Sequence, residues 1–154
     1  MATGTFKWFA QALHDLGEKI HDLSSDDIRF GLVTNATVPA VNTTAPHWGG
    51  SGTTNFASTQ ITTATSYTGP IALASEAWTL GATGAVFDAA DPSAIAQDAG
   101  GATNIAYAIF YNNTDANKRC LGYLELSSSG AISLVSGSLT ITFNASGVLS
   151  LAQS

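Results

Sequence analysis

Apolar residues recur every three or four positions near the start of the chain. Polar residues fill the positions between them, among them Lys7, Asp15 and Lys19. This spacing is typical of an amphipathic helix with one apolar face. Turn-forming residues follow at 22–27, so the sequence predicts a helix over residues 5–21. Its apolar positions are Phe6, Phe9, Ala10, Leu13, Leu16 and Ile20.

From residue 27 onward the period changes to two. Ile28, Phe30 and Leu32 alternate with Arg29 and Gly31, a pattern typical of a half-buried strand. The next segment, 34–55, is rich in Thr, Asn, Pro and Gly and predicts a long loop. A loop of this length in a compact domain usually has a function.

Short strand-like runs separated by turn signals continue to the end of the chain. Such spacing is typical of an antiparallel β-sandwich or a jelly-roll-like barrel. We therefore expect a mainly-β single domain over residues 1–154, with an N-terminal amphipathic helix at 5–21 and a β-domain at 27–151. The later strands are predicted near 56–62, 70–74, 76–80, 84–88, 104–111, 119–126, 131–135, 138–144 and 147–151.

Charge is scarce and mostly negative. Charged residues make up 10% of the chain, and the formal net charge is −6. No Lys or Arg occurs between residues 30 and 117, so a nucleic-acid backbone would be repelled over most of the surface. We therefore expect no nucleic-acid partner. The low charge fits either an ordinary β-domain with polar uncharged faces or a subunit partly buried in an assembly.

Neither a membrane-spanning segment nor a secretory signal is expected. The chain has no apolar run of roughly 18 residues, the length that a membrane-spanning helix needs. Its N-terminus also lacks a basic segment followed by an apolar stretch and a cleavage site. These patterns predict a protein made in a cytoplasm, with no membrane partner.

Residues that support catalysis or bind metals are sparse. Cys120 is the single cysteine, and no local pattern indicates an activated thiol. Glu18 and His21 have a metal-binding spacing, but one helix cannot complete such a site. Asp88 and Asp91 precede a proline and are typical of a turn. The sequence predicts no catalytic residue, no metal ligand and no cofactor.

Several blocks of sequence, taken in order, resemble a known family. The chain is similar to small structural proteins of tailed-bacteriophage particles. It departs from them at 93–102, where an Ala-rich stretch replaces the charged segment with Trp or Tyr that the family carries. The resembling blocks are the HDLSSD turn at 21–26, the strand at 28–34, VFD at 86–88, YAIFY at 107–111, LGY at 121–123 and ITFNASGVL at 141–149.

The resemblance implies a non-enzymatic virion component. The expected role is a capsid decoration, or cement, protein that binds the outside of the head and stabilises contacts between major capsid subunits. Its expected partners are the major capsid protein and other copies of itself, for example in a trimer. It would be made in the host bacterial cytoplasm and sit on the capsid exterior. The candidate contact residues are Ala2, Thr3, Phe6, Trp8 and Trp48, because interface hot spots are rich in aromatic residues.

An alternative role is a binding module on the tail, the baseplate or a head fibre that contacts the host surface. Aromatic rings suit the apolar faces of sugars. Under this alternative Trp48, Tyr67 and Trp78 are expected to be exposed and to form the contact surface.

Overall fold

The computed structural model describes residues 5–81, 84–127 and 132–152. The described chain consists mainly of strands in antiparallel sheets with one short helix, so the predicted mainly-β class is confirmed. In chain order the elements are β1 (Phe6–Trp8), α1 (Ala10–Gly17), β2 (Ile28–Val33), β3 (Pro46–His47), β4 (Thr54–Asn55), the 3-10 helix η1 (Phe56–Thr59), β5 (Ile71–Ala72), β6 (Ala77–Leu80), β7 (Gly84–Asp88), β8 (Tyr107–Asn112), β9 (Cys120–Glu125) and β10 (Leu149–Ala152).

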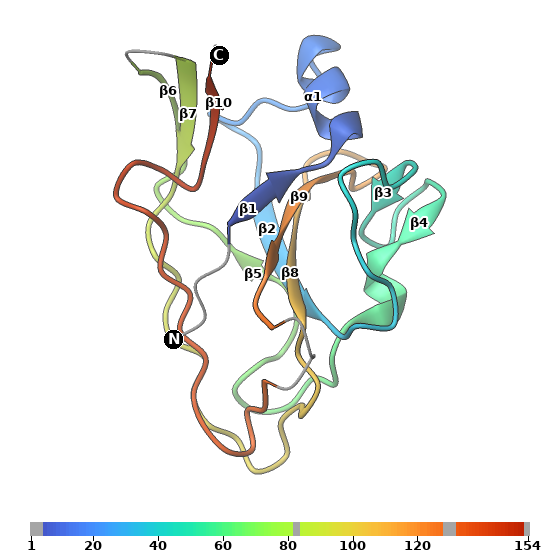
Figure 1. Cartoon of the computed structure of the whole chain (residues 1–154), viewed down its shortest axis with the longest axis vertical. Helices are drawn as coiled ribbons and strands as arrows, with labels where there is room; N and C mark the ends of the chain where they lie inside the picture. Colours follow the sequence, from blue (N-terminus) through green and yellow to red (C-terminus); the bar gives the residue numbers. More distant parts are fainter. Residues whose placement is uncertain (1–4, 82–83, 128–131, 153–154) are drawn as a thin grey trace.

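A five-stranded antiparallel sheet forms the centre of the molecule, in the order β1-β9-β8-β2-β5. Figure 1 shows β2, β8 and β9 side by side in its middle. These three strands are rich in aromatic and aliphatic residues, which favour a pleated and buried surface. A bulge between Phe110 and Tyr111 shifts the register of β8 against β9.

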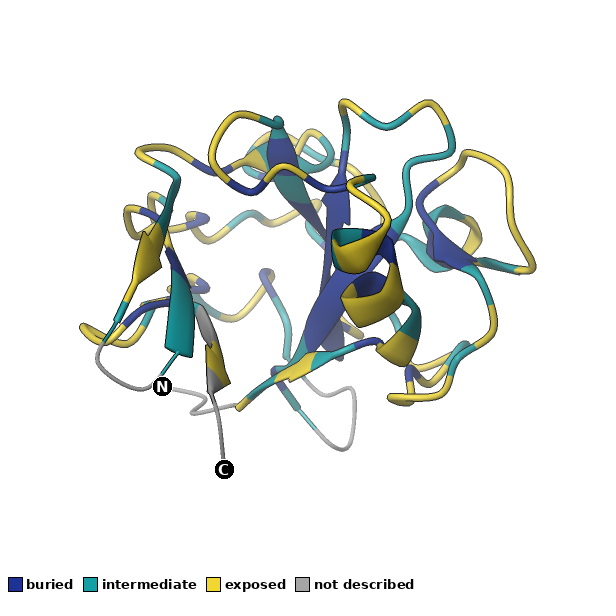
Figure 2. Cartoon of the chain, turned by 90° about the horizontal axis from the view of Figure 1, so that it is seen from above, coloured by how far each residue is buried: buried dark blue, intermediate teal, exposed yellow. Residues whose placement is uncertain are grey.

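Both faces of this sheet are buried, as the dark central strands of Figure 2 show. Ile28, Phe30 and Leu32 of β2 pack into one apolar cluster, whereas Val33 packs into a second cluster on the opposite face. The strand predicted from residue 27 onward is confirmed as β2, but it is buried rather than half-buried. The sequence pattern assigns the face that carries Arg29 and Gly31 to solvent, but other segments of the chain cover that face too.

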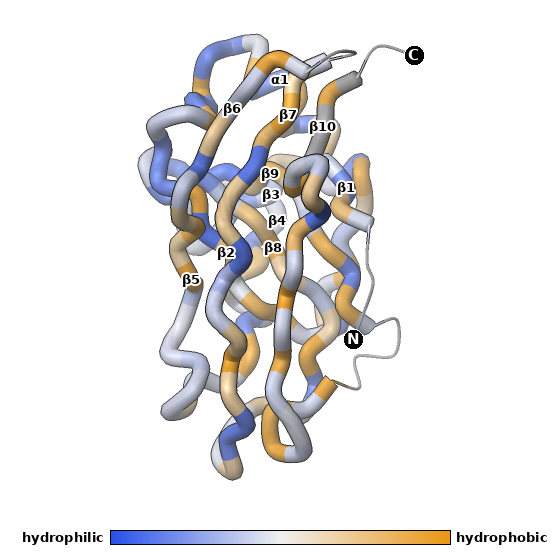
Figure 3. Tube along the Cα trace, turned by 90° about the vertical axis from the view of Figure 1, so that its left-hand side faces the viewer, coloured by the Kyte–Doolittle hydropathy of each residue, from blue (hydrophilic) through white to orange (hydrophobic). Residues whose placement is uncertain are grey.

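The first face is covered by a three-stranded sheet, β10-β7-β6, and by two long extended segments. Residues 89–105 and 132–148 run beside each other along the molecule (Figure 3). They pair through isolated bridges at Ile95–Leu139 and Ile105–Ile132. The strands predicted at 131–135 and 138–144 are wrong, because within the described part of those ranges the chain forms only such bridges.

The second face is covered by α1, η1 and the segment around Trp48. The predicted loop at 34–55 contains two short parallel strands, β3 and β4. The strand predicted near 56–62 is instead the 3-10 helix η1, whose first turn is capped by the Asn55 side chain, which accepts a hydrogen bond from the Ala57 amide.

The predicted helix at 5–21 is wrong at both ends. β1 pairs with the edge of β9, so residues 6–8 are extended and Phe6 and Trp8 face the first cluster. The helix is confined to α1, and its buried side chains are Ala12 and Asp15. It ends in a hydrogen-bonded turn in which the Ile20 amide donates to the Asp15 carbonyl. Pairing with β9 therefore determines the structure of residues 6–8, although their apolar spacing is helical.

Candidate functional site

Trp48 is a core residue rather than a surface contact. Its ring is 5% exposed and stacks on Tyr111, with the ring centroids 5.3 Å apart and the planes at 8°. A side chain at Gly31 of β2 would overlap the same ring. The Trp48 amide donates to the carbonyl of Lys118 at 2.9 Å. The prediction that Trp48 contacts a partner, or presents an exposed aromatic face, is therefore wrong.

Tyr67 is also buried, at 1% exposure. Its hydroxyl oxygen accepts a hydrogen bond from the Leu32 amide at 3.0 Å. Burial raises the pKa of the Tyr67 hydroxyl to about 12. Trp78 is half-buried on β6 and packs against the first cluster. The three rings do not form the exposed surface that the host-binding alternative requires.

The N-terminal candidates divide into two groups. Phe6 and Trp8 are half-buried, and the Phe6 ring meets the Phe110 ring edge-on with the centroids 5.1 Å apart. Their contact with the core agrees with plain core packing. Ala2 and Thr3 lie outside the described residues.

A buried polar cluster joins the end of α1 to the central sheet. The Asn112 side chain donates through Nδ2 to Asp26 Oδ2 at 2.6 Å and lies 3.2 Å from His21 Nδ1. Its Oδ1 accepts from the amides of Thr114 and Asp115. Because Nδ2 is the donor, His21 Nδ1 accepts and the neutral ring carries its proton on Nε2. That nitrogen lies 3.8 Å from Asp15 Oδ2.

The cluster is closed to solvent at His21, whereas its Asp15 side borders a surface groove. The side chains of His21 and Asp15 are almost completely buried, and neither His21 Nε2 nor Asp15 Oδ2 has a hydrogen-bond partner. On its outer side Asp15 Oδ1 accepts from Gln11 Nε2 at 2.9 Å, and the Arg119 guanidinium lies 3.6 Å away. No described Ser, Thr or Cys side chain bonds to His21 as a nucleophile would. The arrangement serves to hold α1, β8 and β9 together.

Sequence reasoning placed Asp15 on the solvent face of the helix and missed this cluster. The signal that could have found it is the co-occurrence of Asp15, His21 and Asn112, three groups that need partners when they are buried. They are far apart in the sequence, so only the fold brings them together.

Burial lowers the pKa of His21 more than Asp15 and the other nearby carboxylates raise it. The folded protein thus holds the ring neutral at a pH where the unfolded chain takes up a proton. We expect the free energy of unfolding to fall as the pH drops from about 7 to 5, by at most about 1.4 kcal/mol per pH unit from this one group.

Urea unfolding of the wild type and His21→Gln at several pH values measures this effect. The variant cannot take up the proton, so its stability should change less over that range. Equal slopes for the two proteins would contradict the assigned protonation state.

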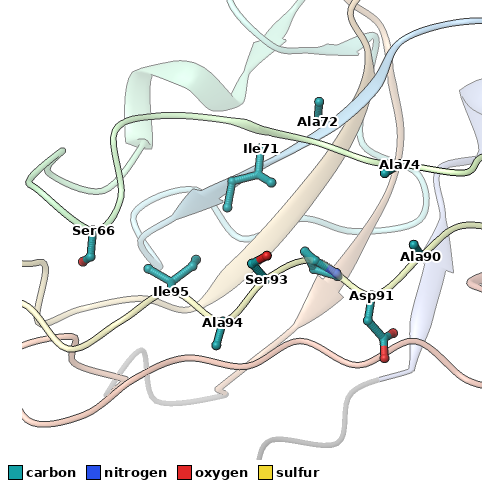
Figure 4. Close-up of a pocket in the computed structure, with 10 residues that line it drawn as sticks. Ser66, Ile71, Ala72, Ala74, Ala90, Asp91, Ser93, Ala94 and Ile95 are labelled. Atoms are coloured by element: carbon teal, nitrogen blue, oxygen red, sulfur yellow. The ribbon is translucent and has the colours of Figure 1, made fainter.

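Two surface grooves flank these elements. One, of about 630 Å³, lies between α1 and the 45–52 segment and includes Asp15 and Arg119 in its wall. The other, of about 340 Å³, lies between the β5 region and residues 90–95 (Figure 4). Figure 4 shows alanine, isoleucine and serine side chains around it, together with Asp91, whose Oδ1 accepts from the Phe143 amide.

Thiol and metal chemistry find no support in the described residues. Cys120 is buried, and burial raises the pKa of its thiol well above the usual value. Such a thiol is a poor nucleophile. Within residues 5–81, 84–127 and 132–152, no three His, Cys, Asp or Glu side chains are grouped so that they could hold a metal ion.

The exposed apolar residues include a row on the three-stranded sheet. Leu80 and Leu151 lie in register on either side of Ala85, so their side chains share one face of the sheet. Two residues further along, the same face carries Phe87, which is fully buried in the first cluster. The apolar face thus extends past the core, where Leu80 is 91% exposed and Leu151 45% exposed. We call Leu80, Ala85 and Leu151 the apolar row.

No charge lies near this row in the sequence. Residues 77–87 and 126–154 contain no Asp, Glu, Lys or Arg. An uncharged sheet face with exposed leucines is typical of a protein contact surface, because interfaces are depleted in charge at their centre. The row is therefore the candidate functional surface. Sequence reasoning placed a strand at 76–80 but could not show that its apolar face extends past the core.

Comparison with known proteins gives no further assignment. Within the described part of the chain, no helix has the length and apolar character needed to cross a membrane. No family model matches the chain, and neither a curated protein nor a solved structure is significantly similar to it.

Proposed function

We propose that the chain is a non-enzymatic structural component of a tailed-phage particle, a decoration protein that binds the outer surface of the head. The observation that carries this proposal is the apolar row, an uncharged apolar surface that extends past the core. The partners in this proposal are the major capsid protein and further copies of the chain.

The positions of the resembling sequence blocks support the proposal. The blocks at 28–34, 107–111 and 121–123 coincide with β2, β8 and β9, three adjacent strands of the central sheet. The HDLSSD block supplies His21 and Asp26 to the polar cluster that fixes the entry into β2. The resemblance therefore covers the framework of the fold. The finer description as a sandwich or jelly-roll-like barrel belongs to this proposal.

The charge distribution fits the outside of a shell. The net charge is −6, and packaged nucleic acid would repel such a surface. Contacts that bridge neighbouring capsid subunits stabilise the assembled state by mass action, since they form only on the shell. The host-binding alternative loses its specific support, because Trp48 and Tyr67 are buried.

Particles made without the chain test this proposal. We expect shells from a phage whose copy of the gene is deleted to assemble and to release their DNA at a lower temperature than complete particles. Adding the purified chain should restore the release temperature. The added chain should also co-sediment with the shells.

A matched pair of variants connects this result to the surface. Leu80→Glu should restore resistance poorly, because it places a charge in the apolar row. Leu13→Glu alters another exposed leucine, on α1, and should restore it fully. If the wild-type chain neither binds the shells nor changes their release temperature, the proposed function is wrong.

A further inference from the structure

The outer edge of β6 is open to another strand. Natural sheets protect their edges with charges, prolines, bulges or covering segments. The edge strand β1 carries the exposed Lys7, and beside the edge strand β5 the Ala90 amide donates to the Ala74 carbonyl. β6 has four residues, Ala77–Leu80, without charge or proline, and its register with β7 has no bulge. In the described structure no strand pairs with its outer edge.

The hydrogen-bond pattern shows which backbone groups point to that edge. The Gly81 amide donates to the Gly84 carbonyl at 2.7 Å and closes the hairpin between β6 and β7. Hydrogen-bonded and non-hydrogen-bonded pairs alternate along an antiparallel ladder. Thr79 therefore bonds towards β7, whereas the N–H and C=O groups of Trp78 and Leu80 point outward.

We propose that this edge pairs with β6 of a second copy of the chain, antiparallel and around a two-fold axis at Thr79. In this register Trp78 lies opposite Leu80 of the second copy, and each pair exchanges two backbone hydrogen bonds. Four hydrogen bonds then join two three-stranded sheets into one sheet of six strands. The parity of the outward-pointing groups and the shared face of the side chains both allow this register, and it pairs both outward-pointing residues, Trp78 and Leu80, within the strand.

The side chains make the edge self-complementary. Trp78 and Leu80 lie on the same face of β6, because they are two residues apart. The two-fold register places the highly exposed Leu80 against the half-buried Trp78 ring of the second copy. Aromatic–aliphatic pairs of this kind across strands stabilise sheets. The exposed Thr79 pairs with its own equivalent on the other face.

The self-complementary edge favours a second copy as the occupant, and charge does not oppose it there. Each chain carries a net charge of −6, so most of its surface repels another copy. The uncharged ranges 77–87 and 126–154 include all three strands of this sheet except Asp88. Two copies can approach there without bringing like charges together. An isologous contact of this kind closes as a dimer. The inference rests on the proposed function only for the role of that dimer on the particle.

A cysteine at the symmetry axis tests the register directly. In the proposed dimer the two Thr79 Cα atoms form a non-hydrogen-bonded pair about 4.5 Å apart, within the range that a disulfide spans. We expect Thr79→Cys to cross-link into a covalent dimer on mild oxidation. Val38→Cys, at an exposed position outside the proposed interface, should form no covalent dimer under the same conditions. The native Cys120 is buried and does not compete.

A proline variant tests the hydrogen bonding without disrupting the fold. Leu80→Pro removes an N–H that points outward, so the β6–β7 ladder keeps its bonds. Sedimentation should give twice the chain mass for the wild type and the single chain mass for Leu80→Pro, with similar thermal unfolding. A wild-type monomer at all concentrations, or an oligomer in which Thr79→Cys does not cross-link, would overturn the inference.

These outcomes separate the inference from the proposed function. A chain that remains monomeric but binds and stabilises shells would refute the dimer and leave the decoration role in place. A chain that dimerises through Thr79 but does not bind shells would support the dimer and refute the decoration role. β6 could instead pair with a strand of the capsid protein. In that case the free chain would be monomeric and Leu80→Pro would lose shell binding. This outcome too would overturn the dimer.

Discussion

Replacing Trp48 with alanine is expected to destabilise the protein by about 3–5 kcal/mol, the range for removing a large buried aromatic side chain. The ring fills the space between Tyr111 and the backbone at Gly31, which has no side chain of its own to fill that space. Its loss also leaves the 45–52 segment without this side-chain anchor, while the backbone hydrogen bond from residue 48 to the Lys118 carbonyl remains. Urea unfolding measured by circular dichroism gives this difference.

Val38→Ala is the control for that experiment. Val38 lies in the same long segment and is 65% exposed, so its truncation should change the free energy of unfolding by less than about 0.5 kcal/mol. If Trp48→Ala costs no more than the control, the ring does not belong to the core, and its assignment as an exposed contact residue returns.

Replacing Asn112 with alanine is expected to cost about 3 kcal/mol, since each buried polar group left without a partner costs about 1–3 kcal/mol. The Asn112 side chain is the common partner of His21, Asp26 and two backbone amides. His21 is buried, so its Nδ1 finds no replacement partner at once.

The neighbouring residue provides a matched control. Asn113 Nδ2 donates to Asp27 Oδ2, but this carboxylate also accepts three hydrogen bonds from Arg29 and is partly exposed. Asn113→Ala should therefore cost no more than about 1 kcal/mol. Similar losses for the two variants, measured by chemical unfolding, would show that the buried cluster contributes little to stability.

The sequence predicts the central strands well because their signals are local. Strands predicted at 84–88, 104–111 and 119–126 agree with β7, β8 and β9 within a few residues. Dense aromatic and β-branched runs between polar turns dictate these elements whatever surrounds them.

The errors arise where a distant segment decides the structure. Residues 6–8 fit a helical period, yet β9 offers them an unpaired edge, and β1 forms there. Trp48 lies in a glycine-rich loop and looks exposed, yet a side chain at Gly50 would collide with the Asn117 backbone, so the loop packs closely against the β8–β9 turn. Such contacts between remote residues produce no periodic pattern in the sequence.

The candidate surface also combines a feature that the local sequence predicts with features that depend on remote contacts. A strand at 76–80 could be predicted, but its register with β7 and the exposure of Leu80 depend on how far the sheet extends past the core. The buried carboxylate of Asp15 is likewise invisible in a pattern that treats every charged residue as solvent-facing.

The copy number of the chain in purified particles tests the central claim most directly. Quantitative mass spectrometry, referenced to the major capsid protein of the phage that encodes the chain, gives this ratio. A decoration protein spread over the shell lattice predicts a ratio near one chain per capsid subunit. A few copies per particle would contradict that placement and move the chain to the tail or a single vertex, and its absence from particles would contradict a virion role altogether.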